Sequence, residues 1–222
     1  PDSRSLIYCA NRGGVSNVWK AGTDGVDETQ LTNNENTNNE DKILLFFNPL
    51  FSPDGGRFTW LEMSSGNQQK SKWSIWIFED GAAKQIYESD SVLGLVGWSQ
   101  LGNELIVKLA KGQSIAALPG EVSLFGLTLD SNASRRITKL KETFFHNIQL
   151  SPDRKTLAFV TRQDGNGVIQ TIPSTGGTAK TLIGSNDARV YFSNLAFAPD
   201  GKTLYYGKQA NWQIISMIDN FK

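Results

Sequence analysis

The chain has 222 residues, of which 39% are hydrophobic and 20% are charged, as in an ordinary globular protein. Lys and Arg together balance Asp and Glu at 22 each. This net charge of zero argues against a nucleic-acid surface, which requires a basic excess. No apolar run approaches the roughly 18 to 20 residues needed to cross a bilayer, so we expect no membrane insertion within this chain.

A turn phrase recurs along the chain, and its spacing predicts the architecture. It reads PDSRSL at 1–6, FSPDGGRF at 51–58, WSQLGNEL at 98–105, LSPDRKTL at 150–157 and FAPDGKTL at 197–204. The proline position of the phrase falls at residues 1, 53, 100, 152 and 199. Repeats of this size with about four short strands each are typical of β-propellers. We therefore expect residues 1–222 to form a single β-propeller segment, with four recognisable repeats and part of a fifth.

Each repeat contains four strand signals, which we name A to D from the central channel outwards. The apolar A strands are expected at 44–51, 92–98, 144–150 and 192–197. The B strands are expected at 4–10, 57–63, 104–110, 156–162 and 203–209. The C strands are expected at 17–22, 74–80, 122–130, 168–173 and 212–219, and the D strands at 29–32, 84–87, 135–138 and 180–183. Aromatic and β-branched residues between Gly, Asn and Asp predict four-stranded antiparallel blades in an all-β fold, without helical periodicity.

The third repeat departs from the turn phrase. Gln100 occupies the proline position and Leu101 the aspartate position, so this turn must close differently from the others.

Two polar segments are interpreted as solvent-exposed. The asparagine-rich segment 33–42 is expected to be a D-to-A loop rather than a binding element. The basic residues Arg135, Arg136, Lys139 and Lys141 are expected to protect an exposed strand edge rather than to form an anion site.

The order of these signals resembles the TolB-like, WD-repeat-like β-propeller repeat. The best copies are SPDGGRFTW with WSIWIFEDG, and PDSRSLIYCANRGGVSNVWKAGTDG with QLT. The resemblance covers nearly the whole chain. It implies one of three settings: a free periplasmic binding protein, the propeller of a prolyl-oligopeptidase-type serine peptidase, or the C-terminal part of a bacterial protein that begins with a kinase or winged-helix domain.

Catalysis within this chain is not expected. The sequence has no G-x-S-x-G nucleophile elbow, and His146 is the only histidine available to a serine–histidine–aspartate set. Cys9 is the only cysteine, and no segment has the ligand spacing of a metal site, so we expect neither metal nor cofactor. The leading hypothesis is a non-catalytic propeller that binds a ligand or protein in a larger bacterial protein. The alternative is the non-catalytic gate of a serine peptidase.

Asparagine recurs at one position of the A strands, three residues before the last residue of each strand. The second, fourth and fifth repeats have Asn48, Asn147 and Asn194 at this position, and the third repeat has Leu95. Because equivalent positions of A strands point the same way, these amides are expected to form a partial ring at the mouth of the channel. The candidate ligand-binding residues are therefore Asn48, His146, Asn147 and Asn194. The structural alternative is that the amides satisfy backbone groups.

The ends of the chain suggest an incomplete propeller, because the first repeat lacks an A strand and the last lacks a D strand. We expect further residues or a partner to cover the open end, since uncovered strand edges promote association between copies. A protein or peptide partner is expected, a small-molecule ligand is the alternative, and nucleic acid is not expected. The resemblance implies a periplasmic or extracytoplasmic location, with a cytoplasmic one as the alternative.

Overall fold

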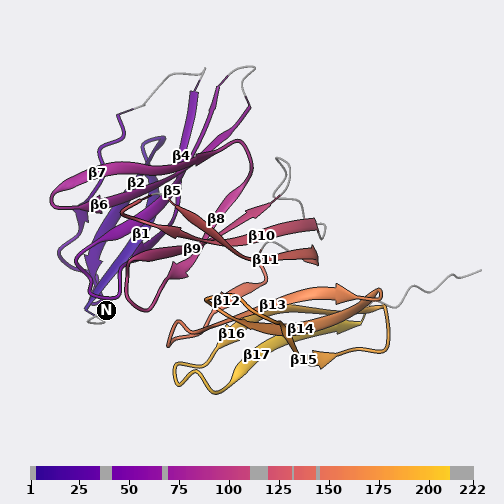
Figure 1. The fold of residues 1–222 in the computed structure, drawn as a ribbon. Coiled ribbons are helices and arrows are strands. Elements are labelled where there is room, and N and C mark those ends of the chain that lie inside the picture. Colours follow the sequence, from indigo (N-terminus) through magenta and orange to yellow (C-terminus); the bar gives the residue numbers. More distant parts are fainter. Residues whose placement is uncertain are drawn as a thin grey trace, which may run out of the picture.

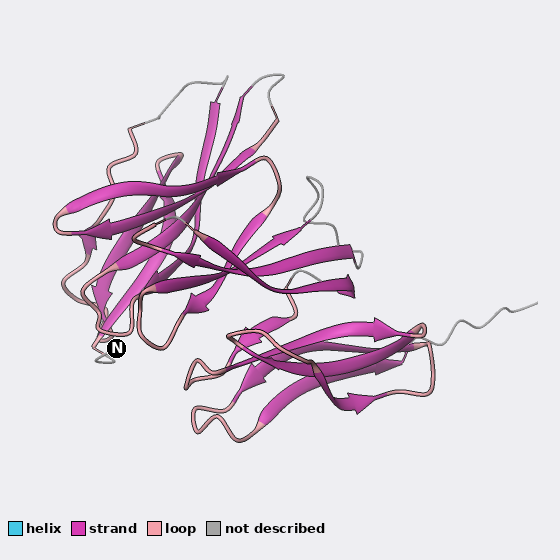
Figure 2. Ribbon diagram, in the orientation of Figure 1, coloured by secondary structure: helices cyan, strands magenta, loops and turns pink. Residues whose placement is uncertain are grey.

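The computed structural model describes residues 4–35, 42–66, 70–110, 120–131, 133–143 and 146–210. Across these ranges the regular structure consists of strands, and none of the described residues is helical (Figure 2). The expected C strand at 212–219 and most of the asparagine-rich segment 33–42 lie outside the described residues.

The strands form five antiparallel sheets that follow one another in chain order (Figure 1). The first sheet contains β1 (Ser5–Arg12), β2 (Val15–Gly22) and β3 (Thr29–Gln30). The second contains β4 (Lys42–Phe51), β5 (Phe58–Gly66), β6 (Lys72–Glu79) and β7 (Ala82–Ser89). The third contains β8 (Leu93–Trp98), β9 (Glu104–Ala110), β10 (Gly120–Thr128) and β11 (Ser134–Thr143).

The fourth sheet contains β12 (Ile148–Leu150), β13 (Thr156–Gln163), β14 (Asn166–Pro173) and β15 (Lys180–Gly184). The fifth contains β16 (Val190–Phe197) and β17 (Leu204–Ala210). Within each sheet, strands that are adjacent in sequence are also adjacent in space, as a propeller blade requires. The all-β fold of four-stranded antiparallel blades is therefore confirmed, and the described sheets do not close into a ring.

The turn between the A and B strands is held by the serine of the repeated phrase. In the second repeat Ser52 Oγ donates to Asp54 Oδ1 at 2.5 Å and accepts from Arg57 N at 3.0 Å. The fourth repeat contains the same serine–aspartate bond at 2.6 Å. In the third repeat Ser99 Oγ instead donates to Asn103 Oδ1 at 3.0 Å. The backbone nevertheless closes this turn as in the other repeats, with Ser99 N donating to Glu104 O at 2.8 Å and Gly102 N donating to Ser99 O at 3.1 Å. The prediction that the third turn closes differently is therefore wrong for the backbone, and the difference is confined to the bond of the serine side chain.

The hydrophobic core lies in layers between consecutive sheets. Of the aromatic residues on the B and C strands, Trp60 is 2% exposed and Phe159 is fully buried. Trp76 is half-buried, with its ring stacked on Trp60 at a centroid distance of 6.1 Å. Trp19 is also half-buried, and its ring is covered by the Arg12 guanidinium at 4.0 Å. Trp60, Trp76 and Phe159 therefore belong to the apolar clusters that join consecutive sheets, together with aromatics of the A strands.

The A strands are innermost. The ends of β4, β8 and β12 converge around a cavity of about 200 Å³. At this point the sheets approach closely. A Cβ built on Gly97 of β8 would lie 2.6 Å from Leu150 Cδ2 of β12. Glycine at 97 thus lets two neighbouring A strands meet at the centre.

Candidate functional site

The four residues predicted at the channel mouth lie on or beside A strands of three different sheets. Asn48 lies in β4, Asn194 lies in β16, and His146 and Asn147 directly precede β12. The side chains of Asn48, His146 and Asn194 are exposed, whereas Asn147 is 8% exposed. The third sheet lies between Asn48 and the other three residues.

Asn48 and Asn194 share an unusual backbone conformation. Their φ angles are 47° and 53°, in the left-handed region that asparagine tolerates better than other non-glycine residues. At each of them the hydrogen-bond ladder to the B strand shifts register, which defines a β-bulge. This conformation gives a physical reason for the recurrence of asparagine. The sequence pattern identified the position but not the bulge.

Asn147 and Asn194 are brought together across two sheets. Asn147 Oδ1 accepts a hydrogen bond from Asn194 N at 3.1 Å, and Asn147 O accepts one from Val160 N at 3.1 Å. The buried amide therefore links the start of β12 to the bulge of β16. Of the two amides, the Asn194 side chain is the one presented to solvent.

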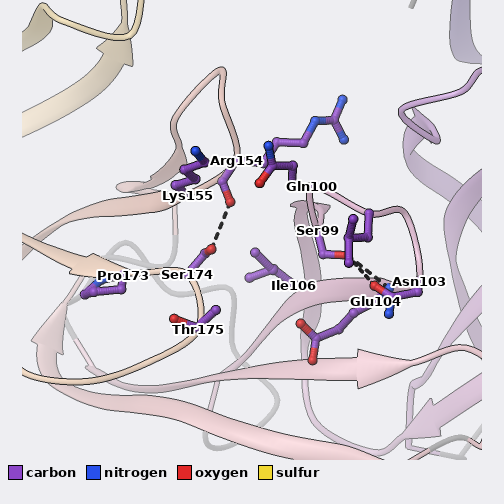
Figure 3. Close-up of a pocket in the computed structure, with 11 residues that line it drawn as sticks. Ser99, Gln100, Asn103, Glu104, Ile106, Arg154, Lys155, Pro173, Ser174 and Thr175 are labelled. Atoms are coloured by element: carbon purple, nitrogen blue, oxygen red, sulfur yellow. Dashed lines mark hydrogen bonds between the residues drawn. The ribbon is translucent and has the colours of Figure 1, made fainter.

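A second candidate site lies between the third and fourth sheets, and sequence reasoning missed it. It is a pocket of about 500 Å³, open to solvent (Figure 3). Its walls come from the third-repeat turn, the fourth-repeat turn and the loop after β14. The lining residues are Ser99, Gln100, Leu101, Asn103, Glu104, Ile106, Arg154, Lys155, Pro173, Ser174 and Thr175. The only sequence signal for this pocket was the irregular third turn.

The irregular turn explains why the pocket forms at this junction. Between the second and third sheets, a Cβ built on Gly102 would lie 3.2 Å from Pro53 Cδ. The glycine of the third turn therefore packs against the proline of the second turn. Between the fourth and fifth sheets, a Cβ built on Gly201 would lie 3.7 Å from Pro152 Cδ in the same arrangement. Between the third and fourth sheets the equivalent positions hold Gln100 and Arg154.

Arg154 is held at the pocket by its backbone. Its φ angle is 63°, its N–H donates to Ser151 O at 2.8 Å, and its carbonyl accepts from Ser174 Oγ at 2.8 Å (Figure 3). The same residue also lines the cavity at the ends of the A strands. Partial burial lowers the pKa of its guanidinium from the ordinary value, because desolvation disfavours the charged form.

Arg135 fastens the third sheet to the fourth along one side of this pocket. Its guanidinium donates to both carboxylate oxygens of Glu104, at 2.8 and 2.6 Å. It also donates to the carbonyls of Thr175 at 2.9 Å and Ser174 at 3.2 Å. We interpreted Arg135 as solvated charge at a strand edge, and the structure instead gives it a role between sheets. Gly126 makes room for this pair, because a Cβ there would overlap the Glu104 carboxylate.

Among the described residues, no group of three or more His, Cys, Asp or Glu side chains could hold a metal ion. None of the described segments forms a helix long and apolar enough to cross a membrane.

No family model matches the chain, and no curated protein is similar to it in sequence. Solved structures are similar in fold. A protein described as TolB from Agrobacterium tumefaciens has a TM-score of 0.61 at 16% identity, over 96% of this chain and 73% of that one. A prolyl endopeptidase has a TM-score of 0.59 at 11% identity, over 88% of this chain and 30% of the enzyme.

A third similar structure is the β-propeller domain of the Trilobed protease from Pyrococcus furiosus, which has an open velcro topology. Its TM-score is 0.54 at 11% identity, over 98% of this chain and 69% of that domain. At sequence identities this low, structural similarity establishes the architecture alone, and an activity has to be argued from the residues of the site. The chain therefore has the β-propeller fold seen in TolB and in protease propeller domains, as its turn phrases predicted.

Proposed function

We propose that this chain is a non-catalytic binding module of a larger bacterial, extracytoplasmic protein. In this proposal a protein or peptide partner docks on the channel face marked by Asn48, His146, Asn147 and Asn194. The observation that carries it is the pair of exposed asparagines held at equivalent β-bulges. Bulges interrupt a ladder and re-aim a side chain, and they are frequent beside functional sites.

The chemistry of the amide suits a peptide partner. Each asparagine side chain offers both a carbonyl acceptor and N–H donors, which is the combination that a peptide backbone presents. Asn48 and Asn194 lie on strands of different sheets, so a partner that contacts both must be extended or protein-sized. Asn147 holds the second of these bulges in place through its bond to Asn194 N.

The test removes the amides without disturbing the backbone. Glycine adopts the left-handed conformation freely, so the double variant Asn48→Gly and Asn194→Gly should fold normally. Asp80→Gly is the matched control, because Asp80 has a φ angle of 51° in an outer hairpin turn. Peptides would be selected from a displayed random library on the unaltered protein, and their affinities measured by fluorescence anisotropy.

We expect selected peptides to bind the double variant about tenfold more weakly or worse, and the Asp80→Gly control as well as the unaltered protein. Equal affinity for all three proteins would rule out the amides as the docking site. Failure to select any peptide would count against a peptide-binding function.

A second candidate function is the gate of a serine peptidase, in which a propeller controls access to a separate catalytic domain. It is favoured by the similarity to the prolyl endopeptidase, of which this chain covers 30%. The full-length gene distinguishes the two. A hydrolase domain in the same reading frame would support the gate, and a kinase or winged-helix domain would support the binding module.

A further inference from the structure

We propose that the pocket between the third and fourth sheets binds a small organic anion that carries a carboxylate or a phosphate, and that Arg154 meets its charge. This site is separate from the channel-face asparagines and from any peptide bound there. Four observations on the lining residues support it: the polar groups left available, the balance of charge, the backbone conformation of Arg154 and the desolvation of its side chain.

The polar groups left available in the pocket are mainly donors. The hydroxyl protons of Ser99 and Ser174 are used within the wall, in bonds to Asn103 Oδ1 and to the Arg154 carbonyl. The Asn103 Oδ1 acceptor is occupied by the first of these bonds. The side-chain N–H groups of Asn103 and Gln100 remain on the wall with the cations, and they outnumber the remaining side-chain acceptors, which are the Gln100 carbonyl oxygen and the Thr175 hydroxyl. A wall that is rich in donors selects a ligand that is rich in acceptors.

The charge of the wall is positive. Arg154 and Lys155 both line the pocket, and the only carboxylate in its wall belongs to Glu104. That carboxylate is bound by Arg135 through two hydrogen bonds, so its charge is already compensated. None of the ion pairs found among the described residues involves Arg154 or Lys155. An anion in the pocket would therefore meet Arg154 and Lys155, and the charge of Lys155 also interacts with the adjacent Asp153 carboxylate.

Arg154 occupies a position that costs conformational energy. The equivalent turn residues are Gly55, Gly102 and Gly201, with φ angles of 76°, 70° and 69°. An L-residue other than glycine is strained in this region, and strain of this kind gathers at functional sites. The turn at Arg154 thus sacrifices local stability while it places an arginine on the wall of the pocket.

The partial desolvation of Arg154 adds to the argument. Water that has been removed from a cation leaves unsatisfied donors, and an anion that binds there restores the lost interactions. The same partial burial lowers the pKa of the Arg154 guanidinium. An arginine that is already partly desolvated loses less on binding than a fully hydrated one.

The experiment uses three probes of one carbon skeleton, measured by isothermal titration calorimetry on the full chain. Glycerate carries a carboxylate, glycerol 3-phosphate carries a phosphate, and glycerol carries no charge. Arg154→Gly removes the guanidinium and restores the residue of the other turns. Lys155→Gln removes the second cation. Lys202→Gln is the matched control, because Lys202 occupies the same turn position in the next repeat and lines none of the pockets described above.

We expect at least one anion to bind, glycerol not to bind, and Arg154→Gly to weaken binding about tenfold or more. Lys155→Gln should weaken it less, and Lys202→Gln should leave it unchanged. Tighter binding of glycerate would assign a carboxylate as the charged group of the ligand, and tighter binding of glycerol 3-phosphate would assign a phosphate. The melting temperature of Arg154→Gly should equal or exceed that of the unaltered protein. The proposal is overturned if neither anion binds, if glycerol binds equally well, or if Arg154→Gly binds normally or melts lower.

Discussion

At the residue scale, Lys108 of β9 is a lysine buried within its sheet. It is 7% exposed, and burial lowers its pKa to about 8 from the ordinary value of 10.5. A pKa that is lower in the folded state means that the unfolded chain holds the proton more tightly. The cost to stability is therefore complete below pH 8 and is relieved as the pH rises towards 10.5.

Replacing Lys108 with methionine should raise the free energy of unfolding at pH 7, by on the order of 3 kcal/mol. The gain should shrink as the pH passes 8 and approach zero near 10.5. Denaturant unfolding of both proteins at several pH values measures it. The exposed substitution Lys202→Met serves as the control and should show no such trend. A gain that is independent of pH would show that desolvation of Lys108 is not its cause.

Two stacked indoles allow a comparison between full and partial burial. Trp60 is 2% exposed, whereas its partner Trp76 is half-buried. Trp60→Ala should lower the free energy of unfolding by roughly 3–5 kcal/mol, as large core deletions do. Trp76→Ala should cost less, because less apolar area leaves water when that side chain folds. Chemical-denaturation midpoints test the order, and a larger loss for Trp76→Ala would contradict it.

Single residues also show where sequence reasoning stops. The recurrence of Asn48 and Asn194 was visible as a pattern, but their left-handed conformation was not, because a pattern of side chains carries no φ angle. Arg154 was equally hidden, since its cost arises only where a turn needs positive φ. Both features became visible once the turn and bulge positions of different repeats could be compared in the structure.

At the scale of elements, the strands were predictable because each repeat contains the same hairpins. The expected B strand at 104–110 is β9 itself, and the other described strands overlap their expected ranges. The D strand expected at 135–138 is longer, extending through β11 to Thr143. The extension pairs with β10 of its own sheet and is also held from the fourth sheet. Thr161 Oγ1 donates to Lys141 O at 2.5 Å, and Thr143 Oγ1 donates to Val160 O. Contacts between sheets of this kind have no local sequence signal.

Two glycines of the fourth sheet test how closely it meets the fifth. A Cβ on Gly167 of β14 would lie 2.8 Å from the Val190 carbonyl of β16, and a backbone atom cannot move aside easily. A Cβ on Gly184 of β15 would make an ordinary contact at 3.6 Å. Gly167→Ala should therefore lower the melting temperature substantially, and Gly184→Ala should have little effect. Equal melting temperatures for the two variants would mean that the sheets are not packed as described.

At the scale of the whole molecule, extensive contacts between described sheets join only consecutive sheets. β1 and β2 contact β4, β4 and β5 contact β8, β11 contacts β13, and β14 contacts β16. A chain built in this way behaves as a linear array, in which each unit is stabilised by its own hairpins and by its neighbours. The second, third and fourth sheets are covered on both faces by described residues, and the first and fifth are covered on one.

This arrangement predicts a gradient of local stability along the chain. Amide hydrogen exchange should be slowest in the second, third and fourth sheets, represented by β5, β9 and β13, and fastest in β1 and β17, because opening an end sheet breaks only one interface. Arg135→Met should accelerate exchange in the fourth sheet more than in the second, since this side chain bridges Glu104 to the Ser174 and Thr175 carbonyls. Mass spectrometry of peptic fragments resolves these regions. Equal protection of all five sheets would show that the described units unfold as one, and that the ends of the array are covered by something other than these residues.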